Sequence, residues 1–286
     1  MLAIIGLVVV LASVIGGFTI AGGKILSLFH VSEIVTILGT ALGTVLISTP
    51  LPVLKGMIGK MVSVLKGGGL KPTVYLDTLK MLYELFQIAR KDGLVAIETH
   101  IEGPEKSAVF KKYPDVLHHH HGMQFLCDNL RLVLVGSVPP HDLDTLMDAE
   151  IDVHHHQDEA MAGALQKVAD ALPGIGIVAA VLGIIVTMAA ISGPVEQIGE
   201  HVGAALTGTM LGVLFAYGFF GPLATAIEHL NRSEGSFYLV LKAAVVAFAK
   251  GFAPIVAVEF ARRAIPSEAR PTFQVMEAAC KSVKLK

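Results

Sequence analysis

Four long apolar runs dominate the sequence, and each is long enough to cross a lipid bilayer. They cover residues 2–21, 34–54, 172–191 and 202–226, and none contains Asp, Glu, Lys, Arg or His. A helix needs about 20 residues, at about 1.5 Å of rise each, to cross the hydrocarbon core. The pattern therefore predicts an all-α integral membrane protein with four transmembrane helices.

A long mixed segment, residues 55–171, separates the second run from the third and predicts a helical domain. After Pro72 the apolar residues recur at helical spacing, and the charged residues fall mostly elsewhere on the helical wheel. A last helix from about Asp142 is expected to run directly into the third apolar run, interrupted only at Pro173. The inward positions are Tyr75, Leu79, Leu82, Phe86 and Ala89, and the outward ones are Asp77, Lys80, Glu84 and Lys91.

The segment after the fourth run, residues 227–286, predicts a helical tail. Its apolar stretch 237–263 contains Lys242 and Lys250. Inserting a lysine at the centre of a bilayer costs about 2.5–3.5 kcal/mol. We therefore expect this stretch to pack on protein or on the membrane surface and not to form a fifth span.

The distribution of basic residues predicts the orientation. Of the 22 Lys and Arg residues, twelve lie between Lys55 and Lys167 and nine follow Ala226. Because cytoplasmic segments carry the excess of Lys and Arg, the loop, the tail and both termini are predicted to be cytoplasmic. The first run reads as an uncleaved anchor, since no Lys or Arg precedes it and its apolar part is longer than the apolar region of a usual signal peptide.

The composition supports a membrane protein and gives little indication of catalytic or binding chemistry. Hydrophobic residues make up 53% of the chain and charged residues 16%, with a mean hydropathy of +0.66. The net charge of −2 gives no indication of nucleic-acid binding. Cys127 and Cys280 are both predicted on the reducing side of the membrane and are expected to be free thiols.

The apolar runs carry small residues but no ionisable group. Faces such as Gly176, Ala180 and Gly183 predict close helix packing, and they favour an oligomer. Proton paths in membranes usually contain ionisable groups, so either the chain conducts nothing or a partner supplies a carboxylate. Thr187 and Thr209, predicted at comparable depth, either line a wet path or hydrogen-bond backbone carbonyls.

Two prolines lie near the predicted cytoplasmic ends of the last two runs. Pro173 is at the start of the third run and Pro222 near the end of the fourth. Each removes a helix hydrogen bond. They either kink the helices without further effect or act as a coupled pair that transmits events in the membrane to the cytoplasmic domain.

Several segments resemble the MotA family of flagellar motor stator subunits, within the MotA/TolQ/ExbB group. The segments "ADALPGIGIVAAVLGIIVTM" (169–188) and "GTMLGVLFAYGFFGPLA" (208–224) resemble the paired third and fourth spans of that family. Further matches are "ARKDGLVAIETHIEGPEKSAVF" (89–110) and "LMDAEID" (146–152). The resemblance extends over essentially the whole chain, whereas ExbB and TolQ relatives usually have three spans.

The resemblance implies partners and a division of labour. Members work with MotB, whose single transmembrane helix supplies the proton-binding aspartate and whose periplasmic domain binds peptidoglycan. Five copies are expected around a MotB dimer in the lipid bilayer, and ion flow is expected to rotate this ring against the rotor protein FliG. The family resemblance implies a motor and channel subunit and not an enzyme, with no cofactor. Protons are the expected ion, and a sodium-driven subunit is the alternative.

The resemblance also assigns roles to individual residues. Pro173 and Pro222 match the prolines linked to conformational coupling, and Arg90 and Glu98 match charges presented to FliG. Arg90 and Glu98 are eight residues apart, which on one helix would place them about 80° apart, so one face would show both. Glu150 matches a further acidic motif with a weaker claim to rotor contact. Ala180, Thr209 and Tyr217 match positions where the family faces the partner helix and its aspartate, and Thr187 is expected on the ion path because of its hydroxyl group.

Two histidine runs, 118–121 and 154–156, raise the possibility of a metal site. At most two residues of each run, such as His118 and His121, would share one ion, and a combined site with Asp158 or Glu159 would need the runs to meet in space. We expect polar positions and no metal site. Two other functions stay open: an energiser of the ExbB/TolQ type, and a membrane hydrolase built on the histidines, although no His-Glu-x-x-His motif is present.

Overall fold

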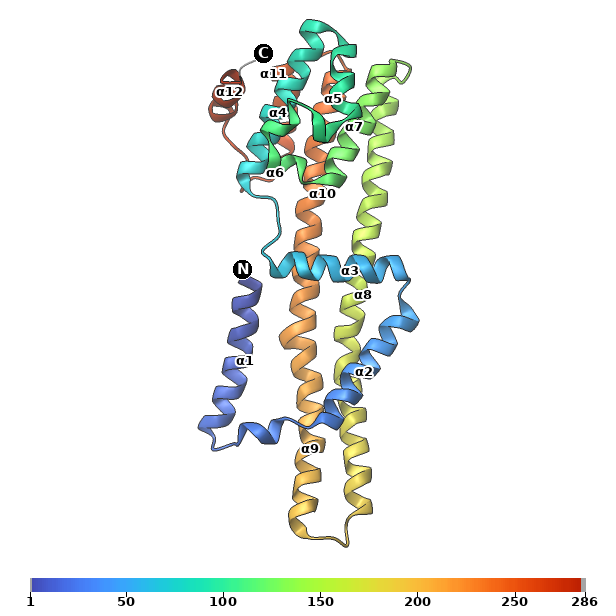
Figure 1. Ribbon diagram of the computed structural model, residues 1–286, viewed down its shortest axis with the longest axis vertical. Coiled ribbons are helices and arrows are strands. Elements are labelled where there is room, and N and C mark those ends of the chain that lie inside the picture. Colours follow the sequence, from blue (N-terminus) through green and yellow to red (C-terminus); the bar gives the residue numbers. More distant parts are fainter. Residues whose placement is uncertain (1, 284–286) are drawn as a thin grey trace. The chain divides into compact units, whose positions relative to one another are not determined.

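The computed structural model describes residues 2–283, and these residues form helices joined by short turns, without any strand (Figure 1). The prediction of an all-α protein is confirmed. The chain divides into two compact units. The first, called the span unit, runs to Gly68 and includes Gln157–Leu230; the second, called the loop–tail unit, contains Gly69–His156 and the chain from Asn231 onward.

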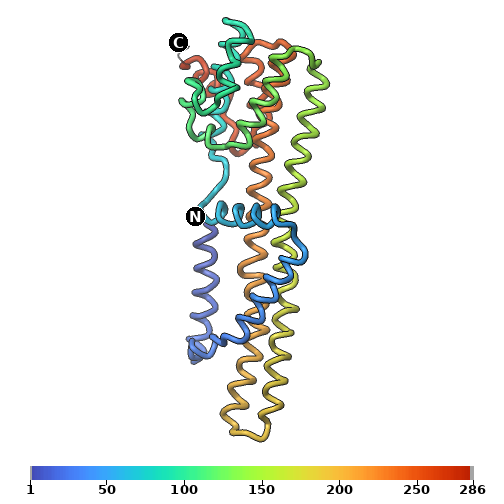
Figure 2. Tube along the Cα trace, turned by 45° about the vertical axis from the view of Figure 1, so that its right-hand side comes forward, coloured from blue at the N-terminus to red at the C-terminus, as the bar shows by residue number. Residues whose placement is uncertain are grey.

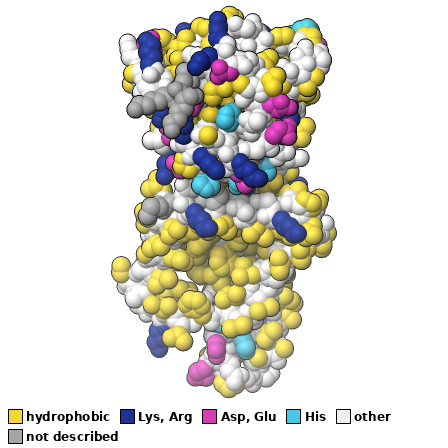
Figure 3. Space-filling view, turned by 45° about the horizontal axis from the view of Figure 1, so that its top comes forward, with side chains coloured by type: hydrophobic (Ala, Val, Ile, Leu, Met, Phe, Trp, Pro, Cys, Tyr) yellow, Lys and Arg dark blue, Asp and Glu magenta, His cyan; other side chains and the backbone are white. Residues whose placement is uncertain are grey.

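The span unit contains the candidate membrane helices. Four helical stretches are long and apolar enough to cross a membrane, which confirms the predicted number. Apolar side chains cover most of the visible face of this unit in Figure 3, as expected for a surface in contact with lipid. The helices are α1 (Leu2–Ile20), the short η1 (Ile25–Leu28) with α2 (Val31–Ser48), α8 (Pro140–Ala189), and α9 (Val195–Leu214), which continues through the π-helix η5 (Phe215–Phe220) into α10 (Gly221–Ala249).

The second apolar run is shorter as a helix than the sequence predicted. Helix α2 ends at Ser48, and Thr49 and Pro50 are extended before α3 begins at Leu51 and continues to Leu65. The expected span 34–54 is therefore wrong at its end. The physical reason is Pro50, because proline disfavours the helical conformation of the residue that precedes it.

Helix α3 packs on α8 within the span unit. Figure 1 shows α3 running across the long helices. Its Met57 lies in one apolar core with Ala162 and Leu165 of α8. Lys60 of α3 forms an ion pair with Asp158 of α8 at 3.1 Å.

Helices α8 and α9 run antiparallel with their backbones in contact, side by side in Figures 1 and 2. A Cβ atom on Gly212 would lie 2.7 Å from the Cα of Gly176 and 2.7 Å from the carbonyl oxygen of Leu172. Farther along, a Cβ atom on Gly183 would lie 3.0 Å from the Cβ of Ala205. The small faces predicted from the sequence therefore meet each other, as close-packed membrane helices require.

The loop–tail unit is built around α4 (Pro72–Asp92). All five residues predicted to face inward from α4 are buried, which confirms the helical periodicity. Glu84 was expected on the outer face, and that prediction was wrong: the residue is 2% exposed and pairs with Lys112. The remaining elements are η2 (Leu94–Ile97), α5 (Glu98–Glu102), η3 (Pro104–Lys106), η4 (Phe110–Lys112), α6 (Pro114–Leu117), α7 (His120–Val135), α11 (Pro254–Ala264) and α12 (Phe273–Lys281).

The apolar stretch 237–263 packs inside this unit, as predicted. It forms the end of α10 and most of α11, separated by a turn at Gly251, whose φ of +83° favours glycine. Phe248 of α10 stacks on Phe86 of α4 with ring centroids 4.2 Å apart. Lys242 pairs with Asp144 at 2.7 Å and with Asp148 at 2.6 Å. The stretch thus owes its apolar composition to a protein core.

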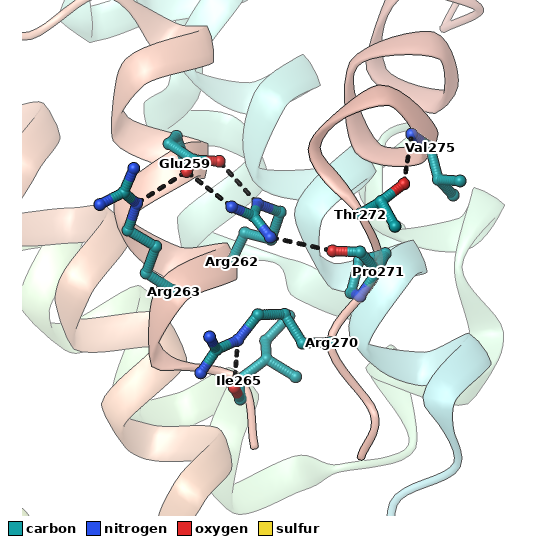
Figure 4. A network of polar contacts seen from close by, with 8 residues as sticks. All are labelled: Glu259, Arg262, Arg263, Ile265, Arg270, Pro271, Thr272 and Val275. Carbon is teal, nitrogen blue, oxygen red and sulfur yellow. Dashed lines mark hydrogen bonds and ion pairs between the residues drawn. The ribbon is translucent and has the colours of Figure 1, made fainter. Parts of the chain in front are cut away.

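Charged hydrogen bonds hold the connection between α11 and α12 (Figure 4). Arg262 donates to Glu259 at 2.6 and 2.8 Å and to the carbonyl oxygen of Pro271 at 3.0 Å. Arg270 donates to the carbonyl oxygen of Ile265 at 2.9 Å. The hydrogen bond from Arg262, joined by one from Arg263, lowers the pKa of Glu259 to about 2, so this carboxylate stays ionised near neutral pH.

The boundaries of the two compact units differ from the segment boundaries predicted from the sequence. The predicted segments 1–54, 55–171, 172–226 and 227–286 express positions relative to a membrane, and that division stays a prediction. In the structure most of the loop and most of the tail form a single unit with one apolar core.

We predict that Gly212→Ala destabilises the span unit by about 1–3 kcal/mol, because the added methyl group meets backbone atoms that have no room to move. The thermal unfolding midpoint of the detergent-solubilised protein measures the effect. Gly174→Ala is the matched control, since a Cβ atom there meets nothing within 4 Å. Equal midpoints for the two variants would show that the α8–α9 contact is not tight.

Candidate functional site

The predicted ion-path residues Ala180 and Thr209 lie at the same level of the α8–α9 pair. A Cβ atom on Gly208, next to Thr209, would lie 3.3 Å from the backbone nitrogen of Ala180. Both Ala180 and Thr209 are partly exposed on the span unit. A partner helix that reached one of these residues would therefore also be close to the other.

Thr187 does not share that level. It lies one turn beyond Gly183, which contacts Ala205, whereas Thr209 lies one turn beyond Ala205 in the opposite direction along the antiparallel pair. The expectation of comparable depth was wrong. The Thr187 hydroxyl donates to the carbonyl oxygen of Gly183 at 2.8 Å, and the residue is 5% exposed. The structure therefore favours the backbone-bonding alternative for Thr187.

Tyr217 lies in the π-helix η5 and is 73% exposed. The backbone N–H of Gly221 donates to the carbonyl oxygen of Ala216, five residues earlier. This wider turn ends directly before Pro222, which lacks an N–H. Such π-helical insertions in α-helices are frequent at functional sites.

Pro173 lies inside α8, which continues through it. The contacts of Gly176 with Gly212 and of Ala169 with Gly221 bracket Pro173, so it lies opposite η5. Pro222 lies near the level of Ala169, more than one helical turn away along α8. The two prolines are therefore close in depth but not level.

The prolines occur in the two helices that contribute to both units. Helix α8 has residues up to His156 in the loop–tail unit and from Gln157 in the span unit, and α10 changes units after Leu230. No other helix in the described part of the chain is shared in this way. Pro173 and Pro222 both lie in the span-unit portions of these helices.

Glu33 is a buried carboxylate that the sequence pattern missed. In the sequence it directly precedes the second apolar run, but in the structure α2 already begins at Val31, and Glu33 is 5% exposed. The Ser32 hydroxyl donates to its carboxylate. The order Val-Ser-Glu immediately before an apolar run was the available signal, because Glu is favoured in the first turn of a helix.

Arg90 and Glu98, the predicted rotor-facing residues, are both exposed but do not share a helix. Helix α4 ends at Asp92, and Gly93, with φ +91° and ψ 161°, turns the chain into η2 before α5 starts at Glu98. The helical-wheel argument for a shared face was therefore wrong, because this backbone conformation is open almost only to glycine and ends the helix.

A buried polar network supports the segment that contains Glu98. Glu84 accepts hydrogen bonds from Lys112 and from Tyr113, the latter at 3.4 Å. His100, two residues after Glu98, is 2.9 Å from the Ser107 hydroxyl through Nδ1. Burial lowers the pKa of His100, so its ring is neutral at pH 7 and the bond to Ser107 does not depend on a charged ring.

Glu150 has a structural partner in the loop–tail unit. Its carboxylate accepts a hydrogen bond of 2.9 Å from the Asn129 side chain of α7. Asn129 is 2% exposed and also donates to the carbonyl oxygen of Phe125 at 2.9 Å. Glu150 therefore ties α8 to α7, and its contact with the rotor stays a prediction.

The two histidine runs meet within the loop–tail unit. The rings of His121 and His154 have centroids 6.5 Å apart, and His154 stacks on Tyr238 at 5.0 Å. His118 and its neighbours line a small cavity of about 190 Å³ with Glu234. No group of three or more His, Cys, Asp or Glu side chains among residues 2–283 is arranged to hold a metal ion.

Cys127 and Cys280 are free and buried, which confirms that they form no disulfide with each other. Burial raises the pKa of each thiol to about 12. Both therefore remain protonated at neutral pH and are poor nucleophiles.

Comparison with known proteins identifies relatives over nearly the full chain. The family model for the N-terminal part of motility protein A matches residues 4–93, and that for the MotA/TolQ/ExbB proton channel family matches residues 118–237. Motility protein A of Escherichia coli K12 is 33% identical over 284 residues, which cover 99% of this chain and 96% of that protein. Chemotaxis protein LafT of Vibrio parahaemolyticus is 36% identical over 273 residues, or 96% of each chain.

Two solved structures share the fold. A chain in the structure of C. jejuni MotAB superposes with a TM-score of 0.76 at 21% identity, covering 93% of this chain and 96% of that one. A chain of the flagellar MotAB stator complex from Bacillus subtilis gives a TM-score of 0.74, with the same identity and coverage.

Proposed function

Since the chain belongs to the MotA/TolQ/ExbB proton channel family, we propose that it is a flagellar motor stator subunit that forms an ion channel with MotB and turns the rotor protein FliG. The full-length similarity to motility protein A carries the proposal. A homo-pentamer around a MotB dimer in the bacterial inner membrane, with both termini cytoplasmic, completes it. The family is one of channels, and we propose no catalytic chemistry.

The apolar wall of α8 and α9 supports a requirement for a partner. Neither 172–189 nor 202–226 contains Asp, Glu, Lys, Arg or His. An ion that loses its water in a bilayer needs charged or polar ligands, and an aliphatic surface provides none. The MotB aspartate supplies that group, beside Ala180 and Thr209.

The route from ion binding to torque follows α8 and α10. Protonation of the MotB aspartate changes the charge next to the wall, and the helices respond where their hydrogen bonding is weakest. Pro173 leaves the carbonyl group four residues earlier without its usual donor, and η5 already departs from α-helical geometry. Because these two helices contribute to both units, a change in them reaches the elements that carry Arg90 and Glu98.

The driving ion tests the function directly. In cells that express this chain with its MotB and no other stator, we expect rotation to stop when the proton gradient is collapsed while the sodium gradient is maintained. Collapse of the sodium gradient alone is expected to leave the speed unchanged. The opposite pattern indicates the sodium-driven alternative, and no rotation under any gradient rejects the stator proposal.

We predict that Pro173→Ala or Pro222→Ala leaves the complex assembled but abolishes or sharply reduces torque. Alanine restores a backbone N–H and strengthens the helix where we propose that it must yield. The speed of tethered cells measures torque, and co-purification with MotB measures assembly. Pro140→Ala is the control, because a proline at the start of a helix costs no hydrogen bond. Normal swimming and load response of both variants would refute the coupling role.

We predict that charge reversal at Arg90 or Glu98 weakens rotor engagement, and that a charge swap on FliG restores it. Long-range attraction between complementary charges is lost on reversal and regained on the swap. Swarm diameter and stator residence time at the motor are the measurements. Lys91→Glu is the matched control, because it makes the same charge change as Arg90→Glu on a side chain that projects about 100° away on α4. If every swap fails while expression is intact, the two residues are ordinary surface charges.

A further inference from the structure

Glu33 places a carboxyl group among three helices of the span unit. The residue belongs to the first turn of α2 and is 5% exposed. A Cβ atom on Gly208 of α9 would lie 3.2 Å from the Cγ atom of Glu33 and 3.3 Å from the Cβ of Ala179 on α8. The side chain of Glu33 thus lies against the same glycine that sets the level of Ala180 and Thr209.

Glu33 forms no ion pair with any of the described residues. Its recorded polar contact is the hydrogen bond from Ser32. The facing part of α8 has no ionisable residue, and the first turns of α9 contribute only Glu196, Glu200 and His201. Burying a carboxylate without an ion-pair partner costs free energy.

A groove runs along the segment that precedes α2 and is lined by residues as far as His30, one turn before Glu33. The groove has a volume of about 880 Å³ and is lined by this segment and by α9, with Lys24, His30, Glu200 and Thr207 among its polar residues. Figure 2 shows the connection between α1 and α2 running next to α9. His30 lies one turn before Glu33, and Thr207 directly precedes the glycine that Glu33 contacts.

His30, near Glu33, provides a second and independent observation. Its Nδ1 atom is buried and has no hydrogen-bond partner within residues 2–283. Buried polar atoms are nearly always paired, with protein groups or with water. His30 is one of the residues that line the groove, one turn before Glu33, and an imidazole ring, which can both accept and donate a proton, is suited to pass one on.

Helix capping alone does not account for the burial and surroundings of Glu33. Glu33 is the third residue of α2, where both Glu and Gln serve in capping boxes, and an acid there also favours the helix dipole. Capping requires neither burial under α9 nor a groove with a histidine. Capping does supply a clean comparison, because Gln keeps the shape and the capping ability of Glu but binds no proton.

We propose that Glu33 is an accessory proton-binding site of this channel, supplied through the groove at His30. A proton from the side of the α1–α2 connection adds to a carboxylate oxygen of Glu33, and the same proton later leaves toward the wall at Ala180 and Thr209. The Glu33 carboxylate is regenerated, and no electron is transferred. This inference rests on the proposed function, since the wall is where the MotB aspartate is placed.

Infrared spectroscopy of the purified complex with MotB tests the site. We expect the wild-type complex to show a protonated-carboxyl C=O band that changes with pH, and Glu33→Gln to lose that component. Glu196→Gln, an exposed residue of α9 outside the groove, is expected to keep it. A band unchanged in Glu33→Gln across the pH range overturns the proposal.

Rotation at varied external pH separates this proposal from the proposed function. We expect Glu33→Gln to assemble and rotate near wild-type speed at acidic external pH, and to lose speed severalfold more steeply than wild type as external protons become scarce. His30→Ala is expected to show the same trend. If wild type rotates and Glu33→Gln follows its pH profile, only the accessory site is rejected. If wild type itself does not rotate with MotB, the stator proposal fails, and the infrared result still decides whether Glu33 binds a proton.

Discussion

The close contact of α8 with α9 at their glycines determines which residues of the span unit lie level with one another. At Gly176 and Gly212 the two backbones approach so closely that a single methyl group would meet main-chain atoms. In lipid, such packing takes the place of the hydrophobic effect as the source of helix association. The same crossing fixes the register, so Ala180 is level with Thr209, Pro173 lies opposite the π-helix, and Gly208 offers a smooth surface to Glu33.

Buried charged side chains have different partners in the two units. In the loop–tail unit, buried charges have near partners: Glu84 with Lys112, and Lys242 with Asp144 and Asp148. Burial lowers the pKa of Lys242, but the two aspartates outweigh it and raise the pKa overall. In the span unit, Glu33 is buried with a serine as its polar neighbour. A paired buried charge has its desolvation cost offset by its partner, whereas a carboxyl group without an ion pair is available for chemistry.

The loop–tail unit holds its exposed charges Arg90 and Glu98 on supported backbone, which suits the proposed contact with the rotor. Because the hydrogen bond of His100 to Ser107 and the pairing of Glu84 hold the segment around α5, Glu98 is presented on a supported backbone. Arg90 lies in the last turn of α4, a helix whose opposite face is buried. Preorganised charges of this kind lose little conformational freedom on binding, which favours specific contact over a generally charged surface.

The sequence by itself determined the class of the protein, the number of spans and the buried face of α4, because hydrophobic length and helical period are local properties. It also identified the stretch 237–263 as unsuited to span a membrane, from the cost of its lysines. Only the tertiary structure decided which residues share a level or a neighbour. Thr187 and Thr209 separate because antiparallel register depends on where the glycines meet, and Arg90 and Glu98 separate because Gly93 ends the helix. Glu33 and Glu84 look like surface residues until the helices that bury them are in place, since burial is a property of the assembled chain.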